Sequence, residues 1–323
     1  MKKLGLLLLV LFFVLLIGVA LFWFVDNKLN YKKNIDVPVI VSVERGMGVL
    51  QIANQLEKNN VIDDARLLVL YIRYLKLANQ IKAGEYQFVG KYSIKDVVEK
   101  IVKGMVIVRS ITIPEGKALV EIKKIINDNP YLTGDITLEV KEGEILPETY
   151  NFNKGETRNG IIEKARKDMK KVLREAFLER NKDIPIKNEE ELLILASIVE
   201  KETGVASERA KVASVFINRL NLGMRLQTDP TVIYAVTGGK MDLGRPIYKR
   251  DLVFDSPYNT YVYGGLPPAP ICSPGIDAIK AVANPDKTKY LYFVADGITG
   301  GHLFAKSLAE HNKNVARYRS LKK

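Results

Sequence analysis

The residues from Leu4 to Val25 form an uninterrupted run without a single charged side chain. As a helix rising 1.5 Å per residue, a run of this length spans the roughly 30 Å hydrocarbon core of a bilayer. Cleaved signal sequences have a shorter apolar region and a small-residue exit site, whereas this run ends in Phe22, Trp23 and Phe24, which suit a membrane interface. We therefore predict an uncleaved single-pass anchor, with a long cleaved signal sequence as the alternative.

The flanking charges indicate the orientation of this anchor. Lys2 and Lys3 precede it, and basic flanks favour the cytoplasmic side. Residues 1–3 are then a cytoplasmic stub, and everything after the anchor (4–25) lies outside the cytoplasm. Lys28, Lys32 and Lys33 reduce the charge asymmetry that supports this orientation. The only cysteine, Cys272, is far from the N-terminus, so a lipidated N-terminus is excluded.

Composition narrows the chemistry. One cysteine and two histidines exclude a disulfide framework and disfavour a histidine zinc site, so we predict no metal and no cofactor. A net charge of +12 favours an anionic neighbourhood of nucleic acid, lipid headgroups or an acidic wall polymer. The lysines are dispersed without an aromatic-interleaved basic run, so nucleic acid is not predicted as a partner.

The rest of the chain predicts an α+β protein. After a polar tether (26–37), residues 38–108 alternate like a strand over 39–46, show helical periodicity from Val49 to Leu56, and continue through a second apolar segment, 67–75, and a short strand near Gly84. A further helix is predicted from Ser93 to Gly104, followed by a strand over 106–116. Such a strand–helix–helix–strand order resembles a LysM-like carbohydrate-binding module, although a spacer domain fits the pattern equally well.

Two further regions follow. Residues 109–185 read as a connecting and accessory helical region, except for the segment Glu142–Phe152, where acidic and aromatic residues around a proline are typical of a site. From 186 to 323 the charges thin out, and Pro, Gly, Tyr and Asn cluster in loops. We take 186–323 as the working domain.

Two glutamates end the helix predicted over 189–203. Leu195, Ile198, Val199 and Glu202 share one face, whereas Glu200 lies about 140° from Leu195 and is expected to reach water. A carboxyl group held against apolar side chains has a raised pKa, as a glycosidic general acid requires. Alternatively, Glu202 forms a structural ion pair with Arg219 on the next helix.

Several loops offer substrate-binding groups. Gln227 and Asp229 precede Pro230, where Asp229 serves either substrate or as a helix cap. Aromatic and amide groups suited to sugar rings, or simply to packing, and a histidine after a glycine pair complete the candidates, which are Tyr258, Asn259, Tyr261 and His302.

Six segments in this order closely resemble the MltG (YceG-like) family of membrane-bound endolytic murein transglycosylases. They are Glu200–Thr203, Ala206–Arg209, Val215–Arg219, Met224–Pro230, Tyr258–Tyr261 and Gly265–Pro268. The resemblance covers nearly the whole chain, more loosely between about 127 and 183, where Pro147–Tyr150 still matches. It implies an N-terminal transmembrane helix, a LysM-like module and a larger YceG-like catalytic domain.

The resemblance also implies an activity and a site. It implies cleavage between N-acetylmuramic acid and N-acetylglucosamine inside peptidoglycan strands, leaving a 1,6-anhydromuramoyl end and limiting nascent strand length. The catalytic acid/base falls on Glu202, with Gln227, Asp229, Tyr258, Asn259, Tyr261, Glu148, Arg219 and His302 around the sugar. The expected location is the bacterial cell (inner) membrane beside cell-wall synthases, the penicillin-binding proteins.

Two alternatives stay open. A non-enzymatic cell-wall adaptor would bind glycan without releasing fragments. A muramidase would use Asp229 or Glu148 as the second carboxylate that a hydrolase needs.

Overall fold

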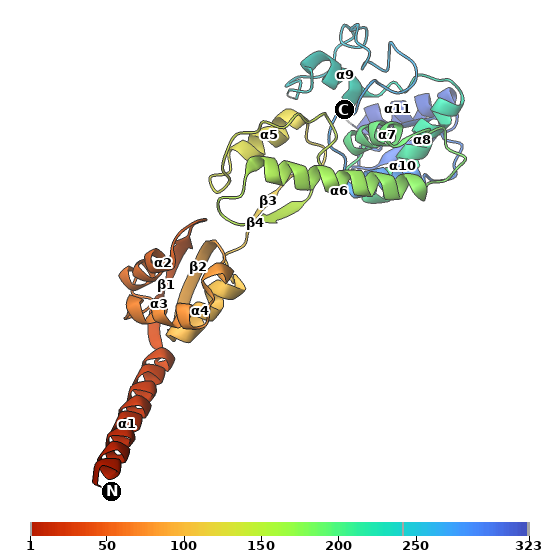
Figure 1. Ribbon diagram of the computed structural model, residues 1–323. Helices are drawn as coiled ribbons and strands as arrows, with labels where there is room; N and C mark the ends of the chain where they lie inside the picture. The colour runs from red at the N-terminus through yellow and green to blue at the C-terminus, as the bar shows by residue number, and fades with distance from the viewer. Residues whose placement is uncertain (1, 241, 322–323) are drawn as a thin grey trace. The chain divides into compact units, whose positions relative to one another are not determined.

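The computed structural model describes residues 2–240 and 242–321, which form two compact units (Figure 1). Unit 1 comprises the residues up to 109 together with 153–155. Unit 2 comprises 110–152 and the residues from 156 onward.

Unit 1 begins with the helix α1 (Lys2–Asn30). Its segment Gly5–Asn30 is long and apolar enough to cross a membrane, which is consistent with a single-pass anchor. The tether expected over 26–37 is not irregular, because α1 continues to Asn30 and the first strand begins at Lys33. The helix continues because Leu29 is buried in the core of the following module and Asp26 forms an ion pair with Lys95 at 2.8 Å.

The module is an antiparallel pair of strands covered by helices. Val41 lies opposite Tyr86 in the pair, and both side chains are buried with the apolar faces of the helices. The elements in order are β1 (Lys33–Val43), α2 (Val49–Lys58), α3 (Ala65–Tyr74), η1 (Ala78–Gln80), β2 (Gly84–Tyr92) and α4 (Ile94–Lys103).

The predicted ends of α4 are confirmed. The Ser93 hydroxyl accepts a hydrogen bond from the Asp96 amide, and Gly104 adopts the left-handed conformation after the last turn. The strands differ from prediction at their ends. β1 starts at Lys33, earlier than expected, and the strand predicted over 106–116 is confined to β3 (Arg109–Thr112).

Unit 2 contains two apolar cores. In the first, β3 pairs with β4 (Thr149–Phe152) and packs with α5 (Leu119–Asn127) and the start of α6 (Arg158–Leu178). The segment between α5 and β4 is irregular rather than helical, since prolines and glycines interrupt it.

The second core surrounds α7 (Glu189–Glu202), in which every residue from Leu192 to Val199 is buried. Figure 1 shows α8, α10 and α11 gathered near this helix, and α6, α8, α9 and α10 contact it. The elements in order after α7 are η2 (Ala206–Glu208), α8 (Arg209–Asn221), α9 (Asp229–Thr237), α10 (Ile276–Ala283), β5 (Tyr292–Ala295), β6 (His302–Ala305) and α11 (Leu308–Leu321). β5 and β6 form an antiparallel pair.

Candidate active site

Glu202 is the last residue of α7, where the central helix of unit 2 ends in a cavity of about 370 Å³. Thr203 is extended, so the chain turns away and the Glu202 side chain is left at the cavity wall. The cavity is lined by Glu202, Phe216, Arg219, Leu226, Gln227, Asp229, Tyr261, Tyr292, Phe293, Leu308 and His311.

The environment of Glu202 keeps a proton on its carboxyl group near neutral pH. Burial is the main cause that raises the pKa of Glu202 to about 7, and the negative charge of Asp229 contributes in the same direction. A hydrogen bond from Thr228 and the positive charges of His302 and Arg219 act in the opposite direction. Such a group can donate a proton and take one back at the same pH.

A hydrogen-bonded network of buried threonines contacts the Glu202 carboxyl group. The Thr228 hydroxyl donates to Glu202 Oε1, and the Thr228 amide donates to Thr260 Oγ1 at 3.1 Å. Thr231 Oγ1 lies 2.7 Å from the Thr228 carbonyl and 2.8 Å from Thr260 Oγ1. With Oε1 occupied, Oε2 is the oxygen that remains to carry a proton toward a ligand.

Arg219 connects the chain segments that form the walls of the cavity. Its guanidinium group donates to the carbonyl oxygens of Leu291 at 2.7 Å, Leu226 at 2.7 Å and Arg225 at 3.2 Å. Within the described chain it forms no ion pair with Glu202, although its charge lowers the pKa of Glu202. Arg219 therefore ties α8 to the Gln227 loop and to β5.

Three other candidate residues line the same cavity. Asp229 accepts a hydrogen bond from the Tyr261 hydroxyl at 2.7 Å, and it occupies the first turn of α9 rather than the cap, which is Thr228. Gln227 has a φ of 50°, a left-handed conformation that costs a non-glycine residue about 1 kcal/mol. Such strain is common at ligand sites.

Four candidates do not line this cavity. Asn259 is fully buried, and its amide group donates to the carbonyl oxygens of its own loop, including that of Phe254 at 2.9 Å. Tyr258 packs on Tyr234, with ring centroids 4.8 Å apart. Glu148 is exposed beside β4. His302 pairs with Glu208 at 2.8 Å on β6, near enough for its charge to lower the pKa of Glu202.

The expectation that Glu200 reaches water is wrong. Its side chain is only 7% exposed, lies 3.7 Å from the Arg209 guanidinium, and accepts a hydrogen bond from the Gly275 amide at 3.0 Å. The helical wheel failed because α7 is covered on more than one face: the N-terminal end of α10 packs where the wheel placed solvent.

Comparison with known proteins now decides the family. The YceG-like family model matches residues 41–317, which is most of the chain. The chain belongs to the YceG-like family. An endolytic murein transglycosylase of Bacillus subtilis is 34% identical over 90% of this chain and 88% of the relative. One of Streptococcus pneumoniae D39 is 29% identical over 91% of this chain and 60% of the relative. A crystal structure of a yceG-like protein from Listeria monocytogenes has a TM-score of 0.52 and 30% identity, covering 86% of this chain and 99% of the other.

Some residues that line the cavity of this YceG-like chain could not be recognised from the sequence. Tyr292, Phe293, Leu308 and His311 come from the C-terminal elements β5 and α11, and His311 stacks on Tyr292 with ring centroids 5.3 Å apart. Thr228 could have been singled out, because it stands between Gln227 and Asp229. Within residues 2–240 and 242–321, no group of three or more His, Cys, Asp or Glu side chains could hold a metal ion.

Another carboxyl group with a raised pKa, that of Glu142, lies elsewhere in unit 2. Burial raises the pKa of Glu142 to about 7. Its Oε1 accepts from the Leu119 amide at 2.8 Å, and its Oε2 accepts from the Tyr234 hydroxyl at 3.4 Å. The proline-containing segment singled out in the sequence thus contributes a half-buried acid with a raised pKa.

Glu142→Gln should change how stability depends on pH. The folded pKa of about 7 exceeds the ordinary 4.5, so the protonated form stabilises the fold, and that stability is lost as pH rises from 4.5 through 7. The wild type loses this stability and the variant does not. The free energy of unfolding of the variant minus that of the wild type should therefore be about 3 kcal/mol larger at pH 8 than at pH 5. Chemical unfolding at both pH values measures this.

Glu144→Gln is the matched control, since Glu144 lies in the same loop and pairs with Arg166 at 3.1 Å. An unchanged difference between Glu142→Gln and wild type at the two pH values would contradict the prediction.

Proposed function

We propose that this chain is a membrane-anchored endolytic murein transglycosylase, the activity in the names of its curated relatives. The supporting observation is Glu202, whose pKa of about 7 and place at the wall of a 370 Å³ cavity suit one group acting first as acid and then as base.

The reaction needs no water. Protonated Glu202 donates its proton to the glycosidic oxygen between muramic acid C1 and glucosamine O4, and that C1–O4 bond breaks. The muramoyl 6-hydroxyl oxygen then bonds to C1, and its proton passes to the Glu202 carboxylate. The charge and proton count are thereby restored, with a 1,6-anhydro ring on one fragment and a free 4-hydroxyl on the other.

The cavity residues assist each stage. The Thr228 hydroxyl fixes Glu202 Oε1, so the proton is presented from Oε2. The Asp229 carboxylate faces the same cavity and can stabilise positive charge that develops at C1. Gln227 and Tyr261 offer amide and phenol groups to the sugar, and the Tyr292 ring offers an apolar face.

The remaining parts of the proposal concern location and partners. α1 anchors the chain in the bacterial cell membrane with its N-terminus in the cytoplasm, and the rest of unit 1 and all of unit 2 lie outside. The β1–α2–α3–β2 order of unit 1 supports a LysM-like module that binds glycan. The region 186–323 is the catalytic region, and cell-wall synthases are the expected partners at nascent strands.

Product mass tests the proposal against a muramidase. Asp229 shares the cavity with Glu202, which is the observation that favours a two-carboxylate hydrolase. Hydrolysis adds one water per cut and leaves a reducing end, whereas transglycosylation leaves an anhydro end. Mass spectrometry of peptidoglycan strands digested by the full chain should find anhydro ends. Reducing ends would establish the muramidase, and intact strands would establish the adaptor.

The pH profile of the reaction should follow Glu202. Because the first step needs the protonated acid and the pKa is about 7, kcat/KM should fall as pH rises above 7. Thr228→Val removes a hydrogen bond that lowers this pKa, so the decline should move to higher pH. Initial rates from pH 5 to 9 measure the shift.

Thr231→Val is the matched control, because Thr231 belongs to the same network without contacting Glu202. Its decline should stay at the wild-type pH. A Thr228→Val profile that differs from wild type only in height would contradict the assignment.

A further inference from the structure

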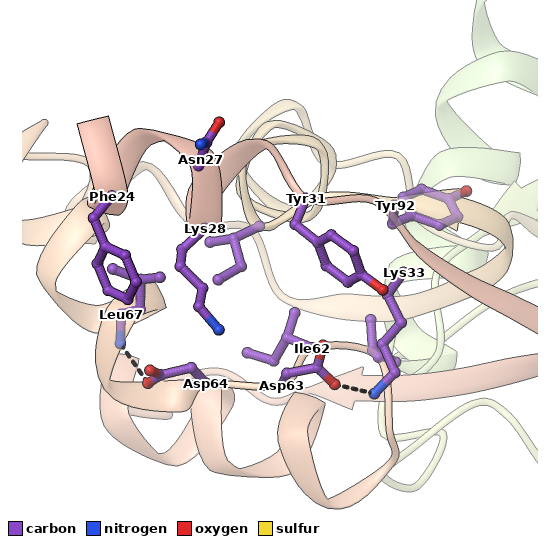
Figure 2. Close-up of a pocket in the computed structure, with 12 residues that line it drawn as sticks. Phe24, Asn27, Lys28, Tyr31, Lys33, Ile62, Asp63, Asp64, Leu67 and Tyr92 are labelled. Carbon is purple, nitrogen blue, oxygen red and sulfur yellow. Dashed lines mark hydrogen bonds and ion pairs between the residues drawn. The ribbon is translucent and has the colours of Figure 1, made fainter. Parts of the chain in front are cut away.

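Unit 1 contains a cavity of about 450 Å³ far along the chain from the catalytic residues. Figure 2 shows it between the end of α1 and the turn that joins α2 to α3. Its lining combines aromatic, apolar and charged side chains: Phe24, Asn27, Lys28, Tyr31, Lys33, Val61, Ile62, Asp63, Asp64, Leu67, Tyr92 and Ile94.

The position of this cavity along α1 places it at the membrane surface. The 20 residues from Gly5 to Phe24 rise about 30 Å, which matches the hydrocarbon core of a bilayer. Phe24 ends this stretch, and Asn27, Lys28 and Tyr31 follow within the next two turns' length of chain, at the depth of the lipid headgroups. This step rests on the anchor proposed above and is independent of the catalytic assignment.

The cavity is a fixed part of unit 1, because side-chain contacts as well as the backbone connect α1 to the module. Leu29 is buried in the module core, and the Asp26 carboxylate lies 2.8 Å from Lys95 Nζ. On α1 a second, largely apolar hollow of about 430 Å³ is lined by Phe22, Val25 and Leu70 among others. Leu70 is 63% exposed, which suits contact with acyl chains.

The charges around the cavity are balanced but not all satisfied. Lys33 Nζ is held by Asp63 at 2.6 Å and by Asn60 at 2.7 Å. Asp64 accepts the Leu67 amide at 2.9 Å through one oxygen, Oδ1, and its second oxygen has no hydrogen-bond partner in the described chain. Lys28 extends from α1 toward the side of the cavity where Asp64 lies (Figure 2), and it makes no ion pair within the described residues. One ammonium group and one carboxylate oxygen therefore face a shared space.

We propose that this cavity binds the zwitterionic headgroup of an aminoethyl phospholipid from the outer surface of the membrane. Lys28 pairs with the phosphodiester, and Asp64 accepts hydrogen bonds from the primary ammonium group. Tyr31 and Phe24 enclose the headgroup, while the adjoining hollow receives part of an acyl chain.

Native mass spectrometry of the full chain, released from nanodiscs of equal parts phosphatidylethanolamine, phosphatidylglycerol and phosphatidylcholine, tests this proposal. Phosphatidylethanolamine should be retained about fivefold more than either other lipid, as expected for one partly exposed charge pair. General attraction to a chain of net charge +12 predicts the opposite, since it favours the anionic glycerol lipid.

Two substitutions and one control complete the experiment. Lys28→Gln should remove the retained lipid, and Asp64→Asn should remove the preference for ethanolamine, since Asn still caps α3. Lys32→Gln is the matched control: Lys32 is a nearby lysine, 60% exposed and outside the cavity. Equal lipid retention in Lys28→Gln and Lys32→Gln, or a preference for phosphatidylglycerol, would overturn the proposal. Failure of α1 to enter nanodiscs would overturn both the anchor and the lipid site that rests on it, whereas catalytic failure would affect neither.

Discussion

Glu202→Gln should lower the rate of anhydro-end formation by about a thousandfold, within the range attributed to general acid–base catalysis. Gln preserves the size of the side chain and can still accept the hydrogen bond from Thr228, but it can neither donate the proton nor take it back. The measurement is mass spectrometry of peptidoglycan strands treated with equal amounts of wild-type and variant full chain, with thermal unfolding to verify the fold.

Glu200→Gln is the matched control for this result. Glu200 lies two residues away on the same helix, also has a raised pKa because it is buried, and contacts Arg209 and the Gly275 amide rather than the cavity. It should retain most of the activity. A Glu202→Gln variant that kept more than about a tenth of wild-type activity would remove Glu202 from the acid/base role.

Arg219→Lys should destabilise unit 2 by about 3 kcal/mol. The guanidinium group is buried and donates to three carbonyl oxygens on two separate segments, whereas one ammonium group cannot reach all of them in the same geometry. Calorimetry of the full chain should show the corresponding transition lowered by about 6–12 °C.

Arg225→Lys provides the comparison, since Arg225 is exposed and makes one hydrogen bond, to the Tyr261 carbonyl at 2.9 Å. Its expected change is within about 0.5 kcal/mol. An Arg219→Lys transition as high as that of Arg225→Lys would show that Arg219 does not hold the cavity walls.

The two glutamates at the end of α7 illustrate how far the sequence could be followed. The 3.6-residue period placed Glu202 on an apolar face, and the structure places it there, half-buried at the wall of the cavity. The same period placed Glu200 in water. A wheel describes one helix by itself, and it contains no information that α10 would cover a further face.

Local sequence signals predicted the ends of helices better than they predicted the residues that line the cavity. Ser93 and Gly104 stand at opposite ends of α4, and each interacts only with the turn next to it. Their roles could therefore be predicted from the sequence. His311 reaches the cavity more than 100 positions after Glu202, through the packing of α11 on β5. Asn259 shows the converse, because an amide that looked suited to sugar is used by its own loop.

The direct passage from α1 into β1 has a mechanical consequence. A hydrophobic helix longer than the local bilayer core adapts by tilting. With Leu29 buried in the module and Asp26 held by Lys95, such a tilt is passed on to the module instead of being absorbed by a flexible joint. For the proposed anchor, the angle at which the module stands on the membrane is therefore expected to change with bilayer thickness.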